Sequence, residues 1–460
     1  MKVASIVLCA GVGSRMKSSK AKILHQLAGK PMAYWPIKNA LESGSHKPVI
    51  VVNHQRELVE AELKRHFHDQ ISFVLQEVPE GTGSAVKAAI GKLDPDCESV
   101  LIVYGDTPLL QKASLDKLIT IQQRSHVPIA LLSTRAVNPT GYGRIVRNDA
   151  QQIVAIVEEL EANQLEKEIS EINPGVYVFD ADFLRENIYK IDNNNAKKEY
   201  YLTDLIKIYL KSGAKLGPVQ SIEVSYEEIH GVNDRCQLAF AEQVLNRRML
   251  ERWMLDGVSI IDPSSTYIEE SVLLAKDVVI YPGVHLRGHT CVGEACVIEN
   301  GCVINDTIIE KNAHIYPYSC TDQAYIGERS QVGPFARLRP EARLDQDVKV
   351  GNFIEIKRSR LKKGTKAGHV AYIGDADIGE DCNIGAGSIS CNYDGKNKFR
   401  TIIGDRVFVG SNTTLVAPLS IGNDSYIAGG STINKEVPKE TLAIGRAQQV
   451  NKARHWQDRS

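Results

Sequence analysis

The sequence predicts two folded parts joined by a helix: an α/β domain with a mainly parallel sheet, then a parallel β-helix of hexapeptide repeats. Three observations support this prediction. Strand-like and helix-like segments alternate through the first half, a glycine-rich turn follows the first strand, and aliphatic residues recur every six positions through the second half. We place the first domain at residues 1–228, the linker helix at 229–256 and the repeat domain at 257–460.

Length and composition indicate a soluble globular protein with more than one domain. The chain has 460 residues, of which 24% are charged and 43% apolar, and its net charge is −1. This balance gives no indication of a nucleic-acid surface, and no apolar run is long enough for membrane insertion. Nine cysteines are scattered without a C-x-x-C spacing. We therefore expect reduced, buried thiols and a cytoplasmic location rather than disulfides or a zinc site.

The glycine-rich turn after the first strand has the features of a phosphate-binding loop. The apolar run Val3–Leu8 leads into Gly11 and Gly13, and Arg15 and Lys22 follow. Glycine lets backbone N–H groups approach a phosphate, and the two cations supply positive charge. The third glycine of a dinucleotide-binding turn and the Gly-Lys-Ser/Thr of a P-loop are both absent. The sequence therefore indicates a phosphate loop of another kind, with an ordinary tight turn as the alternative.

The first domain is expected to place polar residues at the carboxyl ends of its strands, where parallel sheets bind ligands. The predicted strands are Ala4–Leu8, Val49–Val52, Phe73–Leu75, Val100–Tyr104 and Ala130–Ser133, and the helices between them include Glu57–His66 and Ser84–Lys92. The polar and glycine residues near the strand ends are Gln76, Gly81, Thr82, Tyr104, Gly105, Asp106, Gly143, Glu158 and Asn173. We expect them to line one pocket.

Several of these residues also have a purely structural interpretation. Thr82 is equally suited to cap a helix, Asp106 to form an Asx-turn, and Asn233 to cap the linker helix. A lone carboxylate after a buried strand is also a good ligand for a hard metal ion, which makes Asp106 a candidate metal residue. Tyr200 and Tyr201, which precede a later helix, are interpreted as packing residues.

Taken in order, these residues resemble the motifs of the sugar-1-phosphate nucleotidyltransferases, above all the uridyltransferases that act on N-acetylglucosamine 1-phosphate. The resemblance covers the first domain and implies a Rossmann-like nucleotidyltransferase fold. The substrate-binding residues that it implies are Leu8, Cys9, Ala10, Gly11, Lys22, Gln76, Gly81, Thr82, Tyr104, Gly105, Asp106, Gly143, Glu158, Asn173 and Asn233. Two residues depart from the family pattern: Cys9 stands where alanine is usual, and Ala21 precedes Lys22 where proline is usual.

The chemistry implied by this resemblance is transfer of a uridylyl group. A sugar phosphate oxygen attacks the α-phosphorus of UTP and pyrophosphate leaves, so the site must position the reactants and neutralise charge. By resemblance, Arg15 and Lys22 are catalytic, and Asp106 and Asn233 hold one Mg²⁺. The uridine would be held by Leu8 to Gly11, Gln76, Gly81 and Thr82, and the sugar by Gly143, Glu158 and Asn173.

A long helix is predicted between the two domains. It runs from Asn233 to about Leu255 without a glycine or proline, and Gly257 follows as a stop signal. Its apolar residues recur at three- and four-residue spacing, as in Leu238, Ala241, Leu245 and Met249. We interpret it as a linker, with the last helix of the first domain as the alternative.

The second half keeps a six-residue period in three runs, from Leu274 to Ile304, from Ile326 to Ile356 and from Ile403 to Ile433. A fixed hexapeptide period is typical of a β-helix, in which each hexad gives one short strand and one inward aliphatic side chain. The period breaks between Ile356 and Ile378 and again before Ile403. The second break, Cys391–Lys398, is predicted to be a polar loop outside the solenoid.

The repeat domain resembles the glucosamine-1-phosphate acetyltransferases in four motifs. These are Arg337–Pro340, Gly351–Lys357, Lys366–His369 and Cys391–Gly395. The resemblance implies a left-handed β-helix, acetyl-CoA as co-substrate, and a homotrimer with active sites between subunits. It implies His369 as the catalytic base and Glu355 as a group that orients it. The sugar phosphate would bind Arg339 and Lys357, the sugar Tyr372, Asn383 and Asn392, and acetyl-CoA Ala386, Asn392, Tyr393, Ser411, Gly429 and Arg446.

Together the two resemblances imply one bacterial bifunctional enzyme that makes UDP-N-acetylglucosamine, the precursor of cell-wall and lipopolysaccharide sugars. One alternative is a nucleotidyltransferase whose β-helix is only an oligomerisation module, which the His369 motif argues against. Another is a non-catalytic subunit, which would predict loss of Arg15, Lys22 or Asp106. Beyond Val437 we expect a basic tail that covers the solenoid end or a neighbouring subunit; its cations are Lys439, Arg446, Lys452, Arg454 and Arg459.

Overall fold

The structure, a computed structural model, describes residues 2–452. The chain divides into two compact units, Met1–Leu245 and Asn246–Ser460, and the division falls within helix α8 (Arg235–Leu255). The predicted linker helix is therefore present, while the domain limits at 228 and 256 stay predictions. None of the helices in the described residues is long and apolar enough to cross a membrane. Arg454 and Arg459 of the predicted basic tail lie outside the described residues.

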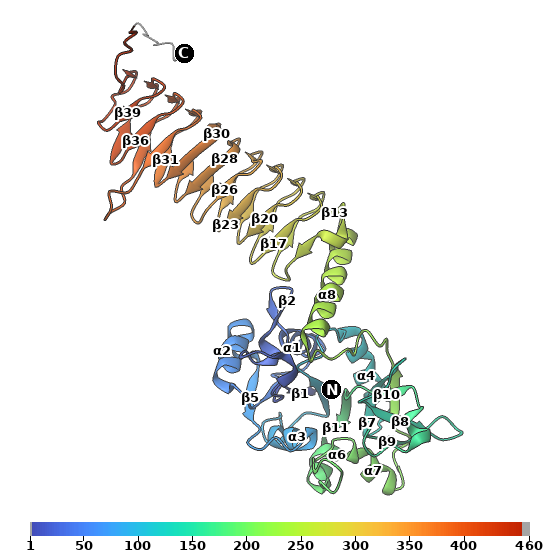
Figure 1. Ribbon diagram of the computed structural model, residues 1–460. Helices are drawn as coiled ribbons and strands as arrows, with labels where there is room; N and C mark the ends of the chain where they lie inside the picture. The colour runs from blue at the N-terminus through green and yellow to red at the C-terminus, as the bar shows by residue number, and fades with distance from the viewer. Residues whose placement is uncertain (1, 453–460) are drawn as a thin grey trace, which may run out of the picture. The chain divides into compact units, whose positions relative to one another are not determined.

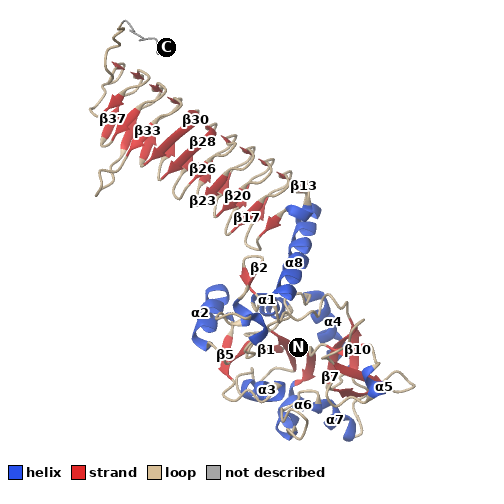
Figure 2. Ribbon diagram, in the orientation of Figure 1, coloured by secondary structure: helices blue, strands red, loops and turns tan. Residues whose placement is uncertain are grey.

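The first unit is built on one sheet of ten strands (Figures 1 and 2). Its order is β5-β4-β1-β6-β11-β7-β10-β8-β9, with β12 paired to β7. The strands are β1 (Val3–Leu8), β4 (Val49–Val52), β5 (Ser72–Leu75), β6 (Ser99–Tyr104), β7 (Ile129–Arg135), β8 (Gly143–Arg147), β9 (Ile153–Val157), β10 (Glu171–Asn173), β11 (Tyr177–Asp180) and β12 (Gln220–Glu223). All five strands named from the sequence are present, each within two residues of its predicted ends.

Only half of this sheet has the parallel arrangement predicted from the sequence. Strands β5, β4, β1 and β6 are parallel neighbours, and β12 is parallel to β7. Strands β8 to β11 pair antiparallel with their neighbours. For β8 and β9 the reason is local, because the turn at 148–152 is too short for a parallel crossover. The prediction of a mainly parallel sheet is thus correct for strands β5, β4, β1 and β6 and wrong for strands β8 to β11.

Helices cover both faces of the sheet and bury its aliphatic side chains in two cores. On one face lie α1 (Tyr34–Glu42), α2 (Arg56–Phe67) and α4 (Lys112–Ser125). On the other lie α3 (Thr82–Ile90), α6 (Ala181–Asn187) and α7 (Asp204–Lys211). Since both faces are covered, β1 is buried along its whole length and its carboxyl end is held rigidly. The residues that follow β1 start from a fixed point.

The second unit is a left-handed parallel β-helix whose coils stack strand upon strand from β13 (Ser259–Ile260) to β40 (Leu442–Ala443) (Figure 2). Successive coils pair in register, as Val279 with Val297 and Val297 with His314. The inward aliphatics of the three predicted runs form one continuous core, with Leu274 packed at its edge. The six-residue period predicted from the sequence is confirmed, and the stacking of strands extends past Val437 to β40, into the segment predicted to be a tail.

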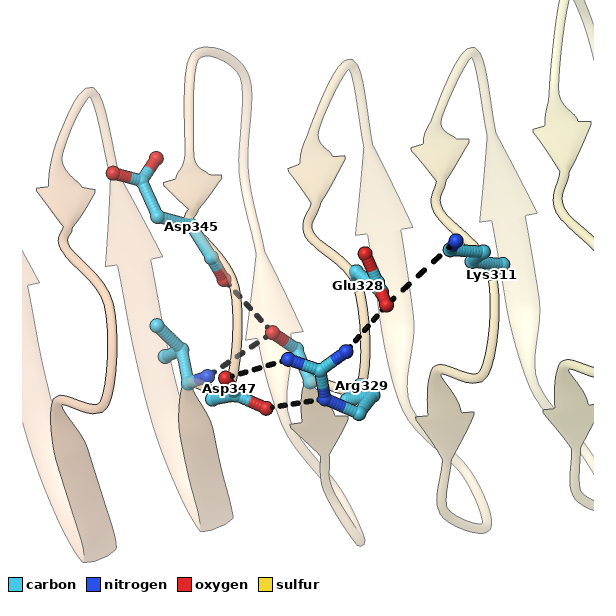
Figure 3. A network of polar contacts seen from close by, with 7 residues as sticks. Lys311, Glu328, Arg329, Asp345 and Asp347 are labelled. Atoms are coloured by element: carbon cyan, nitrogen blue, oxygen red, sulfur yellow. Dashed lines mark hydrogen bonds and ion pairs between the residues drawn. The ribbon is translucent and has the colours of Figure 1, made fainter.

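Ion pairs also join neighbouring coils on the outside of the solenoid (Figure 3). Arg329 forms a two-pronged pair with Asp347, with Nε–Oδ1 and Nη2–Oδ2 distances of 2.8 and 2.9 Å, and a hydrogen bond with Glu328. Lys311 lies 3.9 Å from the same Glu328. Arg406 and Asp424 repeat the arrangement further along at 2.7 Å. These pairs lie at the surface and follow the stacking of the coils.

The two breaks in the period differ in structure. At the first, strands β28 (Lys349–Lys357) and β30 (Lys366–Gly374) run continuously around one corner of the solenoid, where the other coils have two short strands. At the second, Ile389 pairs with Thr414 and Cys391 with Val416. The chain that follows Cys391 therefore leaves the coil and returns to it before Thr414. Residues 393–398 are exposed, which confirms the predicted polar loop.

Candidate active sites

The first unit contains a pocket of about 480 Å³ at the carboxyl ends of its strands. Most of the residues predicted for the nucleotide site line it, namely Leu8, Cys9, Ala10, Gly11, Lys22, Gln76, Gly81, Thr82, Tyr104, Asp106, Gly143, Glu158 and Asn173. They come from β1, β6, β8 and β10, from the start of α3 and from the connecting loops. The sheet therefore brings together residues that are up to 165 positions apart, from Leu8 to Asn173.

A buried lysine bridges the two predicted metal ligands. Lys22 is 7% exposed, and its Nζ donates to Asp106 Oδ2 at 2.5 Å and to Asn233 Oδ1 at 3.0 Å. Val232, next to Asn233, also donates its backbone N–H to Asp106 O at 2.8 Å. The carboxylate and amide oxygens are thus close enough to share one cation, and they are ligand types that Mg²⁺ prefers.

This pair of oxygens fits Mg²⁺ held together with phosphates. Among residues 2–452 no group of three or more His, Cys, Asp or Glu side chains is placed to bind a metal. Mg²⁺ keeps several waters and is commonly bound by one or two protein oxygens plus substrate phosphates. Asp106 and Asn233 supply such a pair at the edge of the pocket.

The side of the pocket near α3 is shaped by Gln76 and Gly81. Gln76 is 5% exposed and donates through Nε2 to Gly81 O at 3.1 Å and to Ser84 Oγ at 2.6 Å. Gly81 has a φ of +98°, and a side chain there would meet Tyr200 O at 2.8 Å. Thr82 accepts at 3.1 Å from the backbone N–H of Leu202 and does not cap α3. The capping interpretation of Thr82 is wrong, and the residue joins two walls of the pocket.

The opposite side of the pocket carries Glu158 and Asn173. Burial raises the pKa of Glu158, and Thr203 Oγ1 donates to its carboxylate at 3.1 Å. Asn173 donates from Nδ2 to the Tyr177 hydroxyl at 2.6 Å and accepts at Oδ1 from the Gly175 N–H at 3.1 Å. Both polar side chains are therefore held in one orientation by neighbouring residues.

Three predicted residues do not line this pocket. Arg15, in the short turn η1 (Ser14–Met16), is exposed to solvent. Gly105 lies behind Cys9, where a side chain would come within 2.3 Å of the thiol sulfur. Asn233 reaches the site through its bond to Lys22. Gly13 has a φ of +68°, and a side chain there would meet Lys22 Cβ at 2.5 Å, so this glycine lets the loop pass over the lysine.

Several residues of the pocket wall carry no motif in the sequence. Tyr201, which was interpreted as packing, lines the pocket together with Thr203 and Lys197. These residues precede and begin α7, and they reach the pocket because Gly83 donates its N–H to Tyr200 O at 2.7 Å, alongside the Gly81 contact. The hydroxyl-rich run before α7 was the available signal.

In the second unit, the residues predicted for acetyl transfer lie on neighbouring coils. Asn352 pairs in register with His369. The next coils continue the same corner: Gly387 N donates to Val370 O at 2.6 Å, Asn412 N to Ala386 O at 2.7 Å, and Gly430 N to Ser411 O at 2.8 Å. His369, Ala386, Ser411 and Gly429 therefore form one column parallel to the solenoid axis, with Arg446 bonded to Gly429 O at 2.6 Å.

His369 has one ring nitrogen fixed and the other free for chemistry. Its Nδ1 lies 2.8 Å from Asn352 Oδ1, an oxygen that only accepts, so Nδ1 carries the proton. The side chain is exposed, so Nε2 is accessible to solvent. Val370, the next residue, has a φ of +33°, a conformation that is strained for a β-branched side chain. The corner thus presents the His369 ring at the surface of the solenoid, with Nδ1 held by Asn352.

A positively charged cluster lies on the coil faces beside this corner. Arg339 pairs with Glu355 at 2.7 Å, and Glu355 is next to Tyr372 in the strand register. Arg339 and Lys398 lower the pKa of Lys357, because their positive charges disfavour its own. Lys398 was not singled out in the sequence, since it belongs to the loop after Cys391. The arrangement fits an anionic group such as a phosphate.

The other predicted residues are held near the same coils. Asn392 is buried and hydrogen-bonds Asp375, which also pairs with Arg358 at 2.7 Å. Asn383 lies in register with Lys366 and Phe408, three positions before Ala386 on its coil. Tyr393 points out with the exposed loop, and its hydroxyl donates to Gly395 O at 2.6 Å. Tyr393 is thus not joined to the column within the described residues.

An exposed aromatic ladder continues the His369 corner in the direction of the N-terminus. The rings of Tyr318, Phe335 and Phe353 stack on successive coils with centroids 5.3 and 5.4 Å apart. Their side chains are 52%, 48% and 59% exposed. Such a stripe of stacked, exposed rings is an unusual feature for a surface in water.

Comparisons with known proteins match both units. A family model described as "Nucleotidyl transferase" matches residues 4–223. A model described as "GMPPB C-terminal domain" matches residues 268–351, and "Bacterial transferase hexapeptide (six repeats)" matches residues 400–435. The first match covers the sheet and pocket, and the others cover parts of the solenoid.

Full-length relatives match as well. The chain is 44% identical over 450 residues to "Bifunctional protein GlmU" of Trichlorobacter lovleyi, covering 98% of this chain and 97% of that one. It is 45% identical to proteins of the same name from Caldanaerobacter subterraneus, covering 97% and 96%, and from Streptococcus mutans, also covering 97% and 96%. The similarity therefore includes both units in the same order.

Proposed function

The chain belongs to the family of bifunctional GlmU proteins, and on this premise we propose how its two sites work. It is a transferase with two activities in the biosynthesis of UDP-N-acetylglucosamine. One moves an acetyl group from acetyl-CoA to glucosamine 1-phosphate. The other moves a uridylyl group from UTP to N-acetylglucosamine 1-phosphate and releases pyrophosphate. The product of the first reaction is the sugar substrate of the second.

For uridylyl transfer, the proposal rests on the contact of Lys22 with Asp106 and Asn233. Lys22 neutralises the triphosphate as the sugar phosphate oxygen attacks the α-phosphorus and pyrophosphate leaves on the opposite side. Asp106 and Asn233 would hold Mg²⁺, which when bound supplies positive charge to the reacting phosphates. Arg15 would reach the phosphates from its exposed turn. Gln76, Gly81 and Thr82 hold the base.

The sugar side of the same pocket is assigned to residues that are already held in place. Glu158 accepts hydrogen bonds from the sugar hydroxyls, and Asn173 forms hydrogen bonds with the hydroxyls and the acetamido group. Gly143 leaves room beside them. A side chain at Gly143 would approach the Glu158 carboxylate at 3.6 Å, so this glycine keeps the carboxylate accessible. Thr203 fixes the orientation of Glu158.

For acetyl transfer, the proposal rests on His369 and its bond to Asn352. Nε2 of His369 takes a proton from the 2-amino group of glucosamine 1-phosphate as the nitrogen attacks the thioester carbonyl, and CoA leaves as the thiolate. Arg339, Lys357 and Lys398 bind the sugar phosphate. Ala386, Ser411, Gly429 and Arg446 would contact acetyl-CoA along the column that starts at His369.

We also propose that the protein works as a homotrimer in the cytoplasm. The exposed position of His369 supports an active site that a second copy completes, and the aromatic ladder on the same corner supports a contact there. All nine cysteines are free thiols, five of them buried, which supports a reducing compartment.

The two assignments are tested by variants that each remove one activity. His369→Ala should lower the rate of thiol release from acetyl-CoA by more than 100-fold and leave uridylyl transfer within twofold of wild type. Lys22→Ala should do the reverse, measured as pyrophosphate release with UTP, Mg²⁺ and N-acetylglucosamine 1-phosphate. Loss of both activities in either variant would contradict the assignment of separate sites. No thiol release from folded wild type would leave only a nucleotidyltransferase.

A further inference from the structure

Lys22 and Asn233 come from distant parts of the chain and must meet at Asp106. The Asn233 segment is joined to Asp106 by the backbone bond from Val232. Lys22 begins the short helical turn η2 (Lys22–Leu24), and its ammonium alone reaches the two oxygens. Something other than the flexible lysine stem must therefore keep this turn at the correct distance from Asn233.

His25 lies where such a contact is needed. It follows η2 directly, donates its backbone N–H to Lys22 O at 3.2 Å, and is only 6% exposed. Its Nδ1 lies 3.2 Å from Nη1 of Arg235, which is two residues after Asn233 and begins α8. Because a guanidinium only donates, Nδ1 is the acceptor and the ring is neutral.

A second contact joins the same two segments. Ala28, three residues after His25, donates its N–H to Glu242 Oε2 at 2.8 Å. Arg235 and Glu242 are seven residues apart and so lie on the same face of α8. The turn that carries Lys22 is thus attached at two points to the helix that begins beside Asn233.

Packing alone does not account for a histidine at this position. With Nδ1 accepting, Nε2 carries the proton; it is buried near the Lys20 backbone but does not reach hydrogen-bond geometry with it. An unpaired buried donor is unfavourable, and a leucine would fill similar space without it. The acceptor at Nδ1 is the property that a leucine lacks.

We propose that His25 and Arg235 are positioning residues for uridylyl transfer, which together hold Lys22 and Asn233 at the separation that the reacting phosphates and Mg²⁺ require. This proposal rests on the roles assigned above to Lys22 and Asn233. Neither His25 nor Arg235 touches the substrate. Both act through the residues beside them in the chain.

The test compares His25→Leu with His25→Asn, whose side-chain oxygen takes the place of Nδ1 and can still accept from Arg235. His25→Leu should lower kcat for uridylyl transfer by 10- to 100-fold while KM for UTP changes less than threefold, because misplacement affects the transition state most. His25→Asn should recover kcat to within about threefold of wild type. Acetyl transfer by the same preparations should stay within twofold and reports that the chain is folded.

Two further measurements exclude a merely structural effect. Binding of Mn²⁺ in the presence of UTP, followed by water-proton relaxation, should weaken in His25→Leu and return in His25→Asn. Arg235→Met should lower kcat to the same extent as His25→Leu, and the double variant should be no worse than either, since both remove one contact. His66→Leu is the matched control, a half-buried histidine of the same unit away from the pocket, and should keep full activity.

The possible failures are distinguishable. An inactive wild type, or an active Lys22→Ala, would overturn the proposed function itself. Equal impairment of His25→Leu and His25→Asn, or additive losses in the double variant, would overturn the positioning role while leaving Lys22 in place. Unchanged uridylyl transfer in His25→Leu would do the same.

Discussion

At the scale of single residues, the nucleotide pocket depends on close contacts that leave no room for substitution on one side. Gly105 and Cys9 are the clearest pair. They follow the neighbouring parallel strands β6 and β1, and the thiol occupies the space that a side chain at Gly105 would need. Burial raises the pKa of Cys9 strongly, so the thiol is an apolar packing group rather than a nucleophile.

This contact predicts a rescue experiment. Gly105→Ala should destabilise the first unit by about 1–3 kcal/mol, because the new methyl group would lie 2.3 Å from the Cys9 sulfur. Cys9→Ala alone should be tolerated, and it should restore stability when combined with Gly105→Ala, since the remaining neighbours lie at 3.4 Å or more. Urea unfolding of the four proteins measures the effect. A double variant as unstable as Gly105→Ala would show that the clash lies elsewhere.

Buried histidines predict how stability depends on pH. Burial is the main cause that lowers the pKa values of His25, His66 and His230. The unfolded chain then binds more protons than the folded one as pH falls below about 6.5, so the free energy of unfolding should decrease from pH 7 toward pH 5. Urea titrations at several pH values test this, and His66→Gln should reduce the decrease. Stability that rises on acidification would contradict it.

Site residues that belong to a sequence motif were predictable. Those whose role depends on a contact between distant parts of the chain were not. Lys22, Asp106 and Glu158 were named from glycine-rich loops and strand ends, and they do line the pocket. His25 carries no motif, and the role we propose for it follows from its contact with Arg235 and from the bond between Ala28 and Glu242. Lys398 was named only as the end of the polar loop, because Lys357, whose pKa it lowers, is distant in sequence. These positive charges come together only because the coils stack in three dimensions.

At the scale of elements, the solenoid is stabilised by its core far more than by its surface ion pairs. Each coil adds inward aliphatics to one continuous core. The arginine–aspartate pairs between coils are exposed at 45% and 35% for Arg329 and Asp347, where water and salt weaken them. The pairs help to fix the register of neighbouring coils and contribute little stability.

This comparison gives a direct prediction. Ile356→Ala should lower the free energy of unfolding by about 2–5 kcal/mol, because Ile356 is fully buried and the coil cannot collapse around the cavity. Arg329→Ala should cost less than about 1 kcal/mol, and less still in high salt. Denaturant unfolding at two salt concentrations distinguishes the contribution of the buried core from that of the surface ion pair. A larger loss for Arg329→Ala would mean that the ion pairs dominate.

The elements were predictable to different degrees. The hexapeptide period gave the solenoid strands closely, because the same inward position repeats in every coil. Strands β8, β10 and β11 gave weak signals, since they are short and joined by turns whose pairing partners cannot be read locally. The continuous strands β28 and β30 were also unforeseen, because neither the repeat period nor the local sequence shows that the two short strands of a coil join there.

At the scale of the whole molecule, the proposed trimer makes the aromatic ladder a necessary part of acetyl transfer. Changing Phe335 and Phe353 together to Asp should dissociate the oligomer and lower acetyl transfer at least tenfold, because the exposed His369 corner would lose its neighbour. Uridylyl transfer should stay within twofold. Light scattering and the two assays measure this.

The control for this prediction lies on another face of the solenoid. Leu273 is 61% exposed and belongs to β15 (Leu273–Leu274), outside the sheet that carries the ladder. Leu273→Asp should leave both the oligomer and acetyl transfer unchanged. Dissociation by this variant too would show that the ladder is not a specific contact.

In the column from Asn352 to Gly429, the stacking of the coils fixes the spacing between the residues of the site. Each coil contributes one residue to this corner, and the residues assigned to acetyl transfer lie on a few adjacent coils. Coils before Tyr318 carry neither the residues assigned to acetyl transfer nor the aromatic ladder, so a whole coil could be removed or duplicated there without changing the spacing of the site. An insertion of a few residues between Asn352 and Gly429, by contrast, would move the residues of the column out of register with one another.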